Sequence, residues 1–308
     1  MTLSIGVSLY PDNGLDTETL LRNSDAAMYR AKYNGRNGFC FYSEDMTERA
    51  QARLSMEADL RVALNEDQFL LYFQPQINFQ TGKLVGVEAL IRWQHPTEGL
   101  LLPGNFISVA EDTGLIVPMG AWVIKQACSF MQKWESMGMN NVQVAVNVSG
   151  RQMWGGGLID TVSDALKSTG CKPACLELEI TEGFLIRKPD KSRAMLDELR
   201  DMGIKVAIDD FGTGYSSLSY LKQFPINKLK IDYSFVRDIP TDTNDQAIST
   251  AIIALGKALE LTVIAEGVES QEQASFLKER GCDQAQGYLY SRPLSQEAFL
   301  AYWQSRED

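Results

Sequence analysis

The sequence predicts an α/β protein whose main domain is a closed barrel of about eight alternating strands and helices. Three observations support this prediction: short β-branched runs recur along the chain, an amphipathic stretch separates each run from the next, and polar side chains gather where the runs end. Alternating strand and helix patterns are typical of parallel βα units. A barrel of eight units needs about 250 residues, and the segment 66–308 fits that size.

Each expected strand alternates apolar and polar side chains. In the run 84–92, Glu88 and Arg92 share one face and Val87 lies on the other, because side chains along a strand point to alternate faces. The same alternation recurs in the runs 142–149, 176–181, 228–232 and 262–266. An antiparallel sheet with one wet face would show it too, so no single run is decisive. The order of the elements favours the barrel.

Amphipathic stretches between the runs predict the helices. They span residues 119–138, 158–169, 190–202, 243–260 and 270–280. In a barrel of this kind the chemistry sits at the carboxyl ends of the strands. We therefore expect the polar residues at the ends of the runs to form one site.

The composition excludes several function classes. Lysine and arginine total 29 against 40 aspartate and glutamate residues, a balance that repels DNA and RNA. No apolar stretch is long enough to span a bilayer, so we expect a cytoplasmic chain without membrane contact of its own. The odd number of cysteines, without a C-x-x-C pair, indicates neither a disulfide framework nor a zinc cage. His95 is the single histidine. If it is structural, the chain has no histidine to act as the base for a serine or cysteine nucleophile.

Six carboxylates would meet at the mouth of such a barrel. Two bare carboxylates about 4 Å apart repel by roughly 4 kcal/mol at an effective dielectric constant of about 20, so the cluster needs cations. Lys230, Arg92 and divalent ions are the candidates, and oxygen ligands with one amide, Asn147, favour Mg²⁺ or Mn²⁺ over zinc. The six carboxylates belong to Glu88, Glu179, Asp209, Asp210, Asp232 and Glu266.

Asp209 and Asp210 are adjacent, and neighbours on a regular strand point to opposite faces. Both can turn toward one site only if the strand ends there. We expect Gly212 and Gly214 to loosen the backbone enough for this, because glycine adopts conformations that other residues avoid.

Residues 1–45 lie outside the barrel pattern. They predict a strand over 3–10 and a helix from Asp16, a plausible N-cap, to near Gly35. The segments Ser4-Ile5-Gly6-Val7-Ser8 and Asp25-Ala26-Ala27-Met28-Tyr29-Arg30-Ala31-Lys32 resemble the closing strand and helix of the GGDEF family of diguanylate cyclases. The signature turn and the nucleotide and metal ligands of that family are absent, so no cyclase activity is assigned to this remnant.

Ser43 could cap a connecting helix, and we expect a linker helix over 46–65. A coiled coil with a second copy is the alternative, but the heptad run is short and charged. A fragment as small as 1–45 buries too little surface to fold alone.

The barrel motifs together resemble the EAL family of cyclic di-GMP phosphodiesterases. They agree in order and spacing over most of the chain, whereas any one of them alone would mean little. They are Glu88-Ala89-Leu90-Ile91-Arg92-Trp93, Asn147-Val148-Ser149, Glu179-Ile180-Thr181-Glu182, Asp209-Asp210-Phe211-Gly212-Thr213-Gly214, Lys230-Ile231-Asp232, Glu266-Gly267-Val268-Glu269 and Gln286-Gly287-Tyr288.

This resemblance implies a modified (β/α)₈ TIM barrel whose first strand, near 69–77, runs antiparallel to the others. It also implies two divalent cations, Mg²⁺ or Mn²⁺, which can activate a water and stabilise the leaving oxygen of a phosphodiester. Asp209 would bridge the two ions. The first ion would be held by Glu88, Asn147, Glu179 and Asp209, and the second by Asp209, Asp210 and Glu266.

The remaining roles also come from the resemblance. Lys230 would orient the attacking water or offset phosphoryl charge, with Asp232 nearby, and Glu266 would double as a base. Arg92, Gln286 and Leu90 would contact the substrate. Glu182 would brace the loop 210–218, although Gly183 replaces the serine usual after this glutamate, which would loosen the loop or its dimer contacts.

The leading hypothesis is hydrolysis of cyclic di-GMP to linear pGpG. A receptor that binds the nucleotide without cleaving it is the alternative, and such receptors usually lack the metal ligands that this chain has. A dimerisation or regulatory module is a third reading, compatible with the first. We expect a homodimer and upstream regulatory domains in the parent protein.

Overall fold

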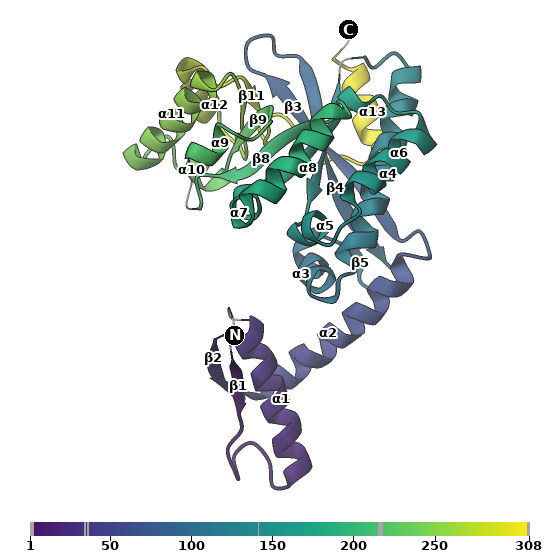
Figure 1. The fold of residues 1–308 in the computed structure, drawn as a ribbon, viewed down its shortest axis with the longest axis vertical. Helices are drawn as coiled ribbons and strands as arrows, with labels where there is room; N and C mark the ends of the chain where they lie inside the picture. The colour runs from purple at the N-terminus through teal and green to yellow at the C-terminus, as the bar shows by residue number, and fades with distance from the viewer. Residues whose placement is uncertain (1–2, 34, 36, 141, 215–217, 307–308) are drawn as a thin grey trace. The chain divides into compact units, whose positions relative to one another are not determined.

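The structure, a computed structural model, describes residues 3–33, 35, 37–140, 142–214 and 218–306. The chain divides into two compact units, Met1–Glu66 and Asp67–Asp308, each with its own sheet (Figure 1). No helix among the described residues is both long and apolar enough to cross a membrane.

The smaller unit pairs two parallel strands with two helices. Its elements are β1 (Ser4–Val7), α1 (Thr17–Tyr33), β2 (Gly38–Phe41) and α2 (Glu44–Ala63). The Asp16 carboxylate accepts the backbone N–H of Thr19 at 2.8 Å, so Asp16 caps α1 as predicted. Helix α2 also begins after Ser43, but the prediction of a side-chain cap there was wrong. The Ser43 hydroxyl donates to the Asp45 carboxylate instead of accepting from the helix backbone.

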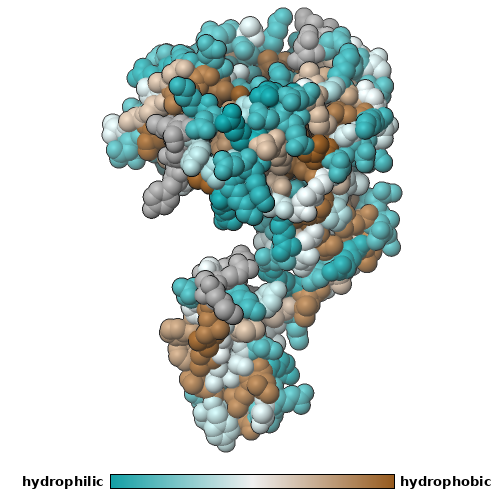
Figure 2. Space-filling model, in the orientation of Figure 1, coloured by the Kyte–Doolittle hydropathy of each residue, from teal (hydrophilic) through white to brown (hydrophobic). Residues whose placement is uncertain are grey.

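Large apolar side chains lie on the surface of this unit. Phe39 is 67% exposed and Phe41 is 53% exposed on β2, and Ile5 on β1 is also exposed. Figure 2 shows brown apolar patches on the surface of this unit. Two short strands and one packed helix leave part of the sheet uncovered, which agrees with the expectation that this fragment buries little surface.

The larger unit is an eight-stranded closed barrel. Its sheet order is β3-β11-β10-β9-β8-β7-β6-β4, and pairing of β3 with β4 closes it. Strand β3 is antiparallel to both neighbours, whereas the other neighbouring pairs are parallel. The predicted barrel with an antiparallel first strand is therefore confirmed. The strands are β3 (Phe69–Asn78), β4 (Leu84–His95), β6 (Gln143–Val148), β7 (Leu176–Thr181), β8 (Lys205–Phe211), β9 (Lys228–Ile231), β10 (Thr262–Ala265) and β11 (Gln284–Ala285).

Helices surround the barrel (Figure 1), and apolar side chains of strands and helices form one core. Each of the predicted helical stretches is helical, with ends that differ by a few residues. The elements are α3 (Pro103–Thr113), α4 (Ile116–Ser136), α5 (Gly150–Trp154), α6 (Leu158–Thr169), η1 (Pro173–Cys175), α7 (Glu182–Arg187), α8 (Pro189–Asp201), α9 (Leu218–Leu221), α10 (Tyr233–Arg237), α11 (Thr243–Ala258), α12 (Gln271–Arg280) and α13 (Gln296–Gln304).

Short elements were missed by the sequence analysis. Strand β5 (Gly99–Leu101) folds back on the end of β4, and α5, α7 and α10 directly follow barrel strands. The turn before β5 depends on His95, whose Nδ1 accepts the backbone N–H of Glu98 at 3.2 Å. His95 is buried and lies at the end of β4, which agrees with a structural role.

The barrel separates apolar and polar side chains by strand face. Val144, Val146 and Leu178 are fully buried between strands and helices. The opposite faces of the same strands carry Asn147 and Glu179, which point into the barrel, because side chains alternate with a period of two. All the cysteines are free, as the sequence predicted.

Candidate active site

The ends of neighbouring parallel strands bring the predicted polar residues together. Asn147, Glu179 and Lys230 lie within one or two residues of the ends of β6, β7 and β9, and Glu266 and Gln286 directly follow β10 and β11. Glu88 differs, since β4 continues for several residues beyond it. Its parallel pairing with β6 stops at Ala89, however, so Glu88 lies at the end of the part of β4 that belongs to the barrel.

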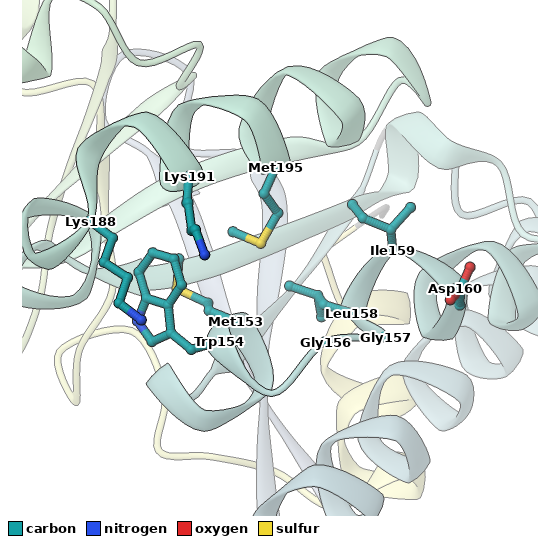
Figure 3. Close-up of a pocket in the computed structure, with 10 residues that line it drawn as sticks. All are labelled: Met153, Trp154, Gly156, Gly157, Leu158, Ile159, Asp160, Lys188, Lys191 and Met195. Carbon is teal, nitrogen blue, oxygen red and sulfur yellow. The ribbon is translucent and has the colours of Figure 1, made fainter.

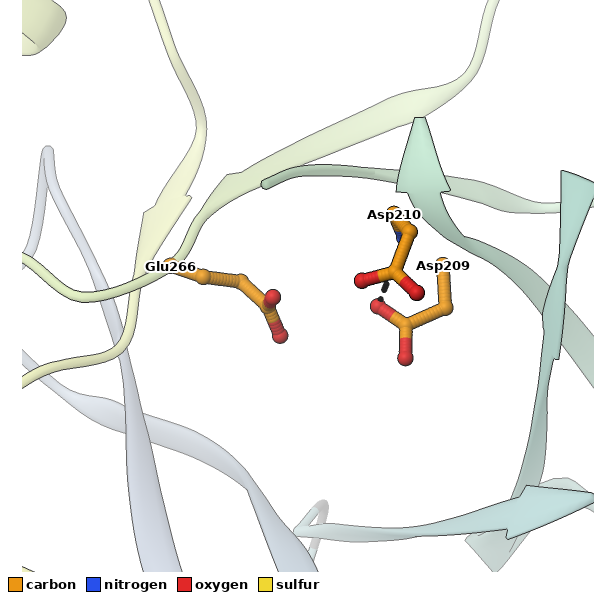
Figure 4. Close-up of side chains that lie close together, drawn as sticks. All are labelled: Asp209, Asp210 and Glu266. Atoms are coloured by element: carbon orange, nitrogen blue, oxygen red, sulfur yellow. Dashed lines mark hydrogen bonds between the residues drawn. The ribbon is translucent and has the colours of Figure 1, made fainter. Parts of the chain in front are cut away.

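Three carboxylates form a compact acidic cluster. Asp209, Asp210 and Glu266 each place an oxygen within 4.8 Å of the others. Figure 4 shows Asp209 and Asp210 on one side and Glu266, which follows β10, reaching toward them. These residues are the predicted ligands of the second cation, and oxygen atoms at this spacing suit a hard divalent ion.

Asp210 itself changes the direction of the backbone. Its φ angle is +53°, in the left-handed region, and the pairing of β8 with β9 shifts register between Ile208 and Phe211. The Asp210 N–H then donates to Oδ1 of Asp209 at 3.0 Å. The expectation that Gly212 and Gly214 alone would allow both aspartates to face one site was therefore incomplete. Aspartate is one of the few residues that tolerate this conformation.

Lys230 is the central cation of the site. Its side chain is fully buried, and its Nζ lies 2.7 Å from Oε2 of Glu179, 3.0 Å from Oδ1 of Asp209 and 2.6 Å from Oε1 of Glu266. Burial alone would lower the pKa of Lys230, but the surrounding carboxylates raise it well above its ordinary value. Lys230 therefore stays charged and holds carboxylates from three strands together.

One ammonium does not neutralise this group of acids. Burial raises the pKa of Glu179 well above its ordinary value and that of Glu266 to about 8. Burial, with the nearby Asp209 and Asp232 carboxylates, raises the pKa of Asp210 to about 6. Oε1 of Glu179 is buried and lacks a hydrogen-bond partner among the described residues. An orphaned buried carboxylate oxygen beside excess negative charge fits a divalent cation.

Glu88 is held by two amides. Nδ2 of Asn147 donates to Oε1 of Glu88 at 2.6 Å, and Nε2 of Gln286 donates to Oε2 of Glu88. Gln286 also donates to Oε1 of Gln74 at 3.1 Å. The predicted ligands Glu88 and Asn147 are thus in direct contact, and Gln286 lies beside them.

These side chains line a cavity of about 520 Å³, which we call the mouth cavity. Its position confirms that the carboxyl ends of the strands surround one hollow, as expected for this barrel. Its lining consists of Gln74, Glu88, Leu90, Asn147, Asp209, Tyr233, Glu266, Gly267, Glu269, Gln286, Gly287 and Tyr288.

The substrate contacts predicted from the sequence lie in two different places. Leu90 and Gln286 line the mouth cavity, but Arg92 is not among its lining residues. Arg92 is buried, its Nη1 donates to the carbonyl of Ile91 at 2.8 Å, and its guanidinium lies 5.4 Å from the centre of the Tyr72 ring. A contact between Arg92 and substrate remains a prediction.

Asp232 and Glu182 lie beside the site. Asp232 caps α10 by accepting the N–H of Ser234 at 3.0 Å, so its catalytic role also remains a prediction. Oε2 of Glu182 lies 3.5 Å from the N–H of Gly212, a long contact in the direction expected of a bracing residue. Residues 215–217 of the predicted loop lie outside the described residues. A Cβ added at Gly183 would meet no atom of the described residues within 4 Å.

Sequence analysis missed several lining residues. Gln74 alternates with apolar neighbours in the run 69–77, and a period-two analysis of that run would have found it. Tyr233 carries no comparable signal, because an isolated tyrosine near a strand end is common, whereas Tyr288 belongs to the Gln286-Gly287-Tyr288 motif but was given no role.

A second cavity, of about 270 Å³, lies between the α5–α6 turn and α8 (Figure 3). Lys188 stands 5.1 Å from the centre of the Trp154 ring, and Lys191 and Met195 face the same space. Asp160 is the single acidic residue among its lining residues. This cavity therefore lacks a carboxylate cluster like the one at the mouth cavity.

Comparison with known families gives two matches along the chain. The EAL domain family matches residues 57–293, and the GGDEF domain of diguanylate cyclases matches residues 1–38. The bifunctional diguanylate cyclase/cyclic di-GMP phosphodiesterase MucR of Pseudomonas aeruginosa is 46% identical over 301 residues, which cover 98% of this chain and 44% of that protein. The cyclic di-GMP phosphodiesterase NbdA of the same organism is 44% identical over 96% of this chain and 38% of its own length. The chain thus spans less than half of each of these relatives.

Solved structures share the barrel. The PaMucR phosphodiesterase in complex with c-di-GMP is 45% identical, with a TM-score of 0.78, over 80% of this chain and 99% of that chain. The EAL enzyme Bd1971, bound to cAMP and cyclic-di-GMP, is 31% identical, with a TM-score of 0.79, over 94% of this chain and 76% of that chain.

Proposed function

The chain belongs to the EAL domain family, and we propose that it hydrolyses one phosphodiester bond of cyclic di-GMP to give linear pGpG. The observation that supports this most strongly is the mouth cavity, where the carboxylates of Glu88, Asp209 and Glu266 surround a hollow of about 520 Å³. The solved PaMucR phosphodiesterase holds c-di-GMP and is 45% identical to this chain.

Divalent cations would offset the excess negative charge of the carboxylates in this site. The substrate carries phosphodiester anions, and it would enter a cavity lined by carboxylates on a chain of net charge −11. Two Mg²⁺ or Mn²⁺ ions would be held by the predicted sets, with Asp209 common to both. Such ions supply Lewis acidity and lower the pKa of a bound water.

The chain's own residues would perform the remaining tasks. Lys230 would keep Glu179, Asp209 and Glu266 in register, since its ammonium contacts all three carboxylates. Glu266, which lines the cavity, would accept a proton from the attacking water. The water oxygen would bond to phosphorus, and the bond from phosphorus to the 3′ oxygen would break. The 3′ oxygen would take up one proton and leave as a hydroxyl group.

The test is to incubate the purified chain with cyclic di-GMP and Mg²⁺ or Mn²⁺ and to separate the nucleotides by chromatography. We expect pGpG from the wild type and none after Glu88→Ala or after chelation. Glu198→Ala, which removes an exposed carboxylate of α8, is the matched control and should leave turnover unchanged. Intact nucleotide that co-elutes with the wild-type protein would support a receptor and contradict hydrolysis.

We also propose that the chain divides into a cyclase remnant (1–45), a linker helix (46–65) and a phosphodiesterase barrel (66–308). We propose that the barrel acts as a homodimer in the cytoplasm. Regulatory domains of the parent protein would control its activity. The GGDEF match to residues 1–38 and the greater length of the relatives support the link to other domains. Light scattering after gel filtration checks the dimer, and a monomer mass at every concentration would contradict it.

A further inference from the structure

A layer of buried polar side chains lies beneath the mouth cavity. Gln76 on β3 and Glu177 on β7 are each 1% exposed, and Lys228 on β9 is 4% exposed. None of them lines the mouth cavity or belongs to the predicted metal ligands. Burying charged and amide groups costs free energy, so a set of them at the centre of a barrel calls for a physical reason.

Hydrogen bonds connect this layer to Glu88. Nζ of Lys228 contacts Oε1 of Glu177 at 2.7 Å and, at the longer distance of 3.4 Å, Oε1 of Gln76. Nε2 of Gln76 donates to Oε1 of Gln286 at 3.1 Å. Nε2 of Gln286 then donates to Oε2 of Glu88. We call the two connected amides the Gln76–Gln286 relay.

The two ends of the relay fix the orientation of both amides. An ammonium can only donate hydrogen bonds and an ionised carboxylate can only accept them. Lys228 therefore requires the oxygen of Gln76 on its side, and Glu88 requires the nitrogen of Gln286 on its side. With both ends fixed, Gln76 presents its nitrogen to the oxygen of Gln286, as the structure shows.

The neighbouring strand leaves room for this arrangement. Gly86 on β4 pairs with Gln76 on β3, and a Cβ added at Gly86 would stand 2.8 Å from Oε1 of Gln76. A side chain at position 86 would therefore displace the atom that Lys228 contacts. Glycine at this position fits a defined place for the Gln76 amide.

We propose that Gln76 is a positioning residue for the metal centre. Anchored by the Lys228–Glu177 ion pair, it holds the oxygen of the Gln286 amide, while Gln74 accepts from the nitrogen of the same amide at 3.1 Å. Gln286 in turn orients the carboxylate of Glu88. The inference rests on the proposed function for the role of Glu88. It assigns a positioning role to Gln76, with Lys228 and Glu177 as its anchor, and none of these residues lines the mouth cavity. Groups that orient metal ligands in this way typically change metal affinity about 10–100-fold when altered.

Two substitutions of Gln76 separate orientation from packing. Gln76→Glu nearly preserves the shape but replaces the donor with an acceptor. Whichever way Gln286 then turns, its oxygen faces a carboxylate, either the one introduced at position 76 or that of Glu88, so the orientation is lost. Gln76→Met removes both hydrogen bonds but leaves Gln286 free to donate to Glu88. Gln143→Glu makes the same change on β6 and serves as the control. Among the contacts described, the Gln143 side chain donates only to the carbonyl of Ala174.

The measurement is calorimetric titration of Mn²⁺ into the metal-free chain without nucleotide, with thermal unfolding of each variant alongside. We expect Gln76→Glu to weaken Mn²⁺ binding at least tenfold, Gln76→Met to weaken it by less than tenfold, and Gln143→Glu to leave it unchanged. Wild-type affinity in Gln76→Glu, or equal losses in both Gln76 variants, would overturn the proposal.

A measurement on the wild type covers the case in which Gln76→Glu does not fold. The side-chain amide protons of Gln286, assigned by their loss in Gln286→Met, should be protected from hydrogen exchange in the metal-free protein. Rapid exchange would overturn the proposal. Neither readout depends on turnover, so a wild type that fails to cleave cyclic di-GMP would contradict the proposed function and leave this test intact.

Discussion

At the residue scale, one buried lysine offsets the negative charge of several carboxylates in the site. Lys230 contacts three carboxylates from three strands, and it is fully buried. A buried charge that loses its partner keeps the cost of desolvation without the compensating attraction. The residues around Lys230 therefore need it for stability and for the geometry of the mouth cavity.

Lys230→Met should lower the free energy of unfolding by about 3–5 kcal/mol in the presence of a chelator. Saturating Mn²⁺ should reduce this deficit, because divalent ions offset the same carboxylates. Urea unfolding with and without Mn²⁺ measures both effects. Lys191→Met, at an exposed lysine of α8, is the control and should stay within about 0.5 kcal/mol of the wild type. Superimposable curves for Lys230→Met and the wild type would contradict the account.

Asp210→Asn tests the charge of the metal-free site. Burial and neighbouring carboxylates raise the pKa of Asp210 to about 6, so the folded protein binds this proton more tightly than the unfolded chain. The Asp210 side chain therefore destabilises the fold increasingly as the pH rises from about 4 to about 6 and fully above that. Asparagine keeps the left-handed backbone conformation without the charge.

With chelator, Asp210→Asn should therefore be more stable than the wild type at pH 8, by about 1 kcal/mol after allowance for the half-buried position. The difference should shrink by pH 5. Urea unfolding at several pH values gives the comparison, and a difference that grows toward acid would contradict the sign argued here.

At the element scale, short helices connect the metal-bearing strands to the outer layer. Helix α5 follows β6, which carries Asn147, and α7 follows β7, which carries Glu179. The two helices touch where Gly150 faces Phe184: a Cβ added at Gly150 would stand 2.4 Å from the Phe184 ring. The same addition at Gly183 would meet no atom within 4 Å in the part of the chain that the structure describes.

These two glycines provide a matched pair of variants. Gly150→Ala should destabilise the protein by about 1–3 kcal/mol, because the added Cβ would force the half-buried Phe184 ring to move. Gly183→Ala should stabilise it by about 0.5 kcal/mol, because alanine loses less conformational entropy than glycine in a helix. Thermal unfolding of both variants checks the contrast, and equal effects would show that the Gly150–Phe184 contact does not limit packing.

The sequence predicted the strands that alternate over several residues and the long amphipathic helices. It missed β5 and the short helices after the strands, because one or two turns provide too few residues for a period to appear. It also missed the conformation of Asp210, since its φ of +53° depends on the register shift of β8 against β9. The direction of Arg92 depends on Tyr72, which a pattern within one strand does not reveal.

At the scale of the whole molecule, the order of the motifs predicted the barrel. Closure of the sheet brings the site residues together. Glu88 and Gln286 are far apart in the chain, yet β3 brings β4 and β11 to its two edges, and Gln286 donates to Glu88. The antiparallel direction of β3 followed from the resemblance and not from its alternation, because a strand pattern is the same in both directions.

The proposed function requires that the mouth cavity bind divalent cations. The most direct measurement is anomalous diffraction at the manganese edge from crystals of the chain soaked in Mn²⁺. We expect two peaks, one among Asp209, Asp210 and Glu266, and one beside Glu88, Asn147 and Glu179. A saturating soak that leaves both positions without anomalous density would contradict this expectation.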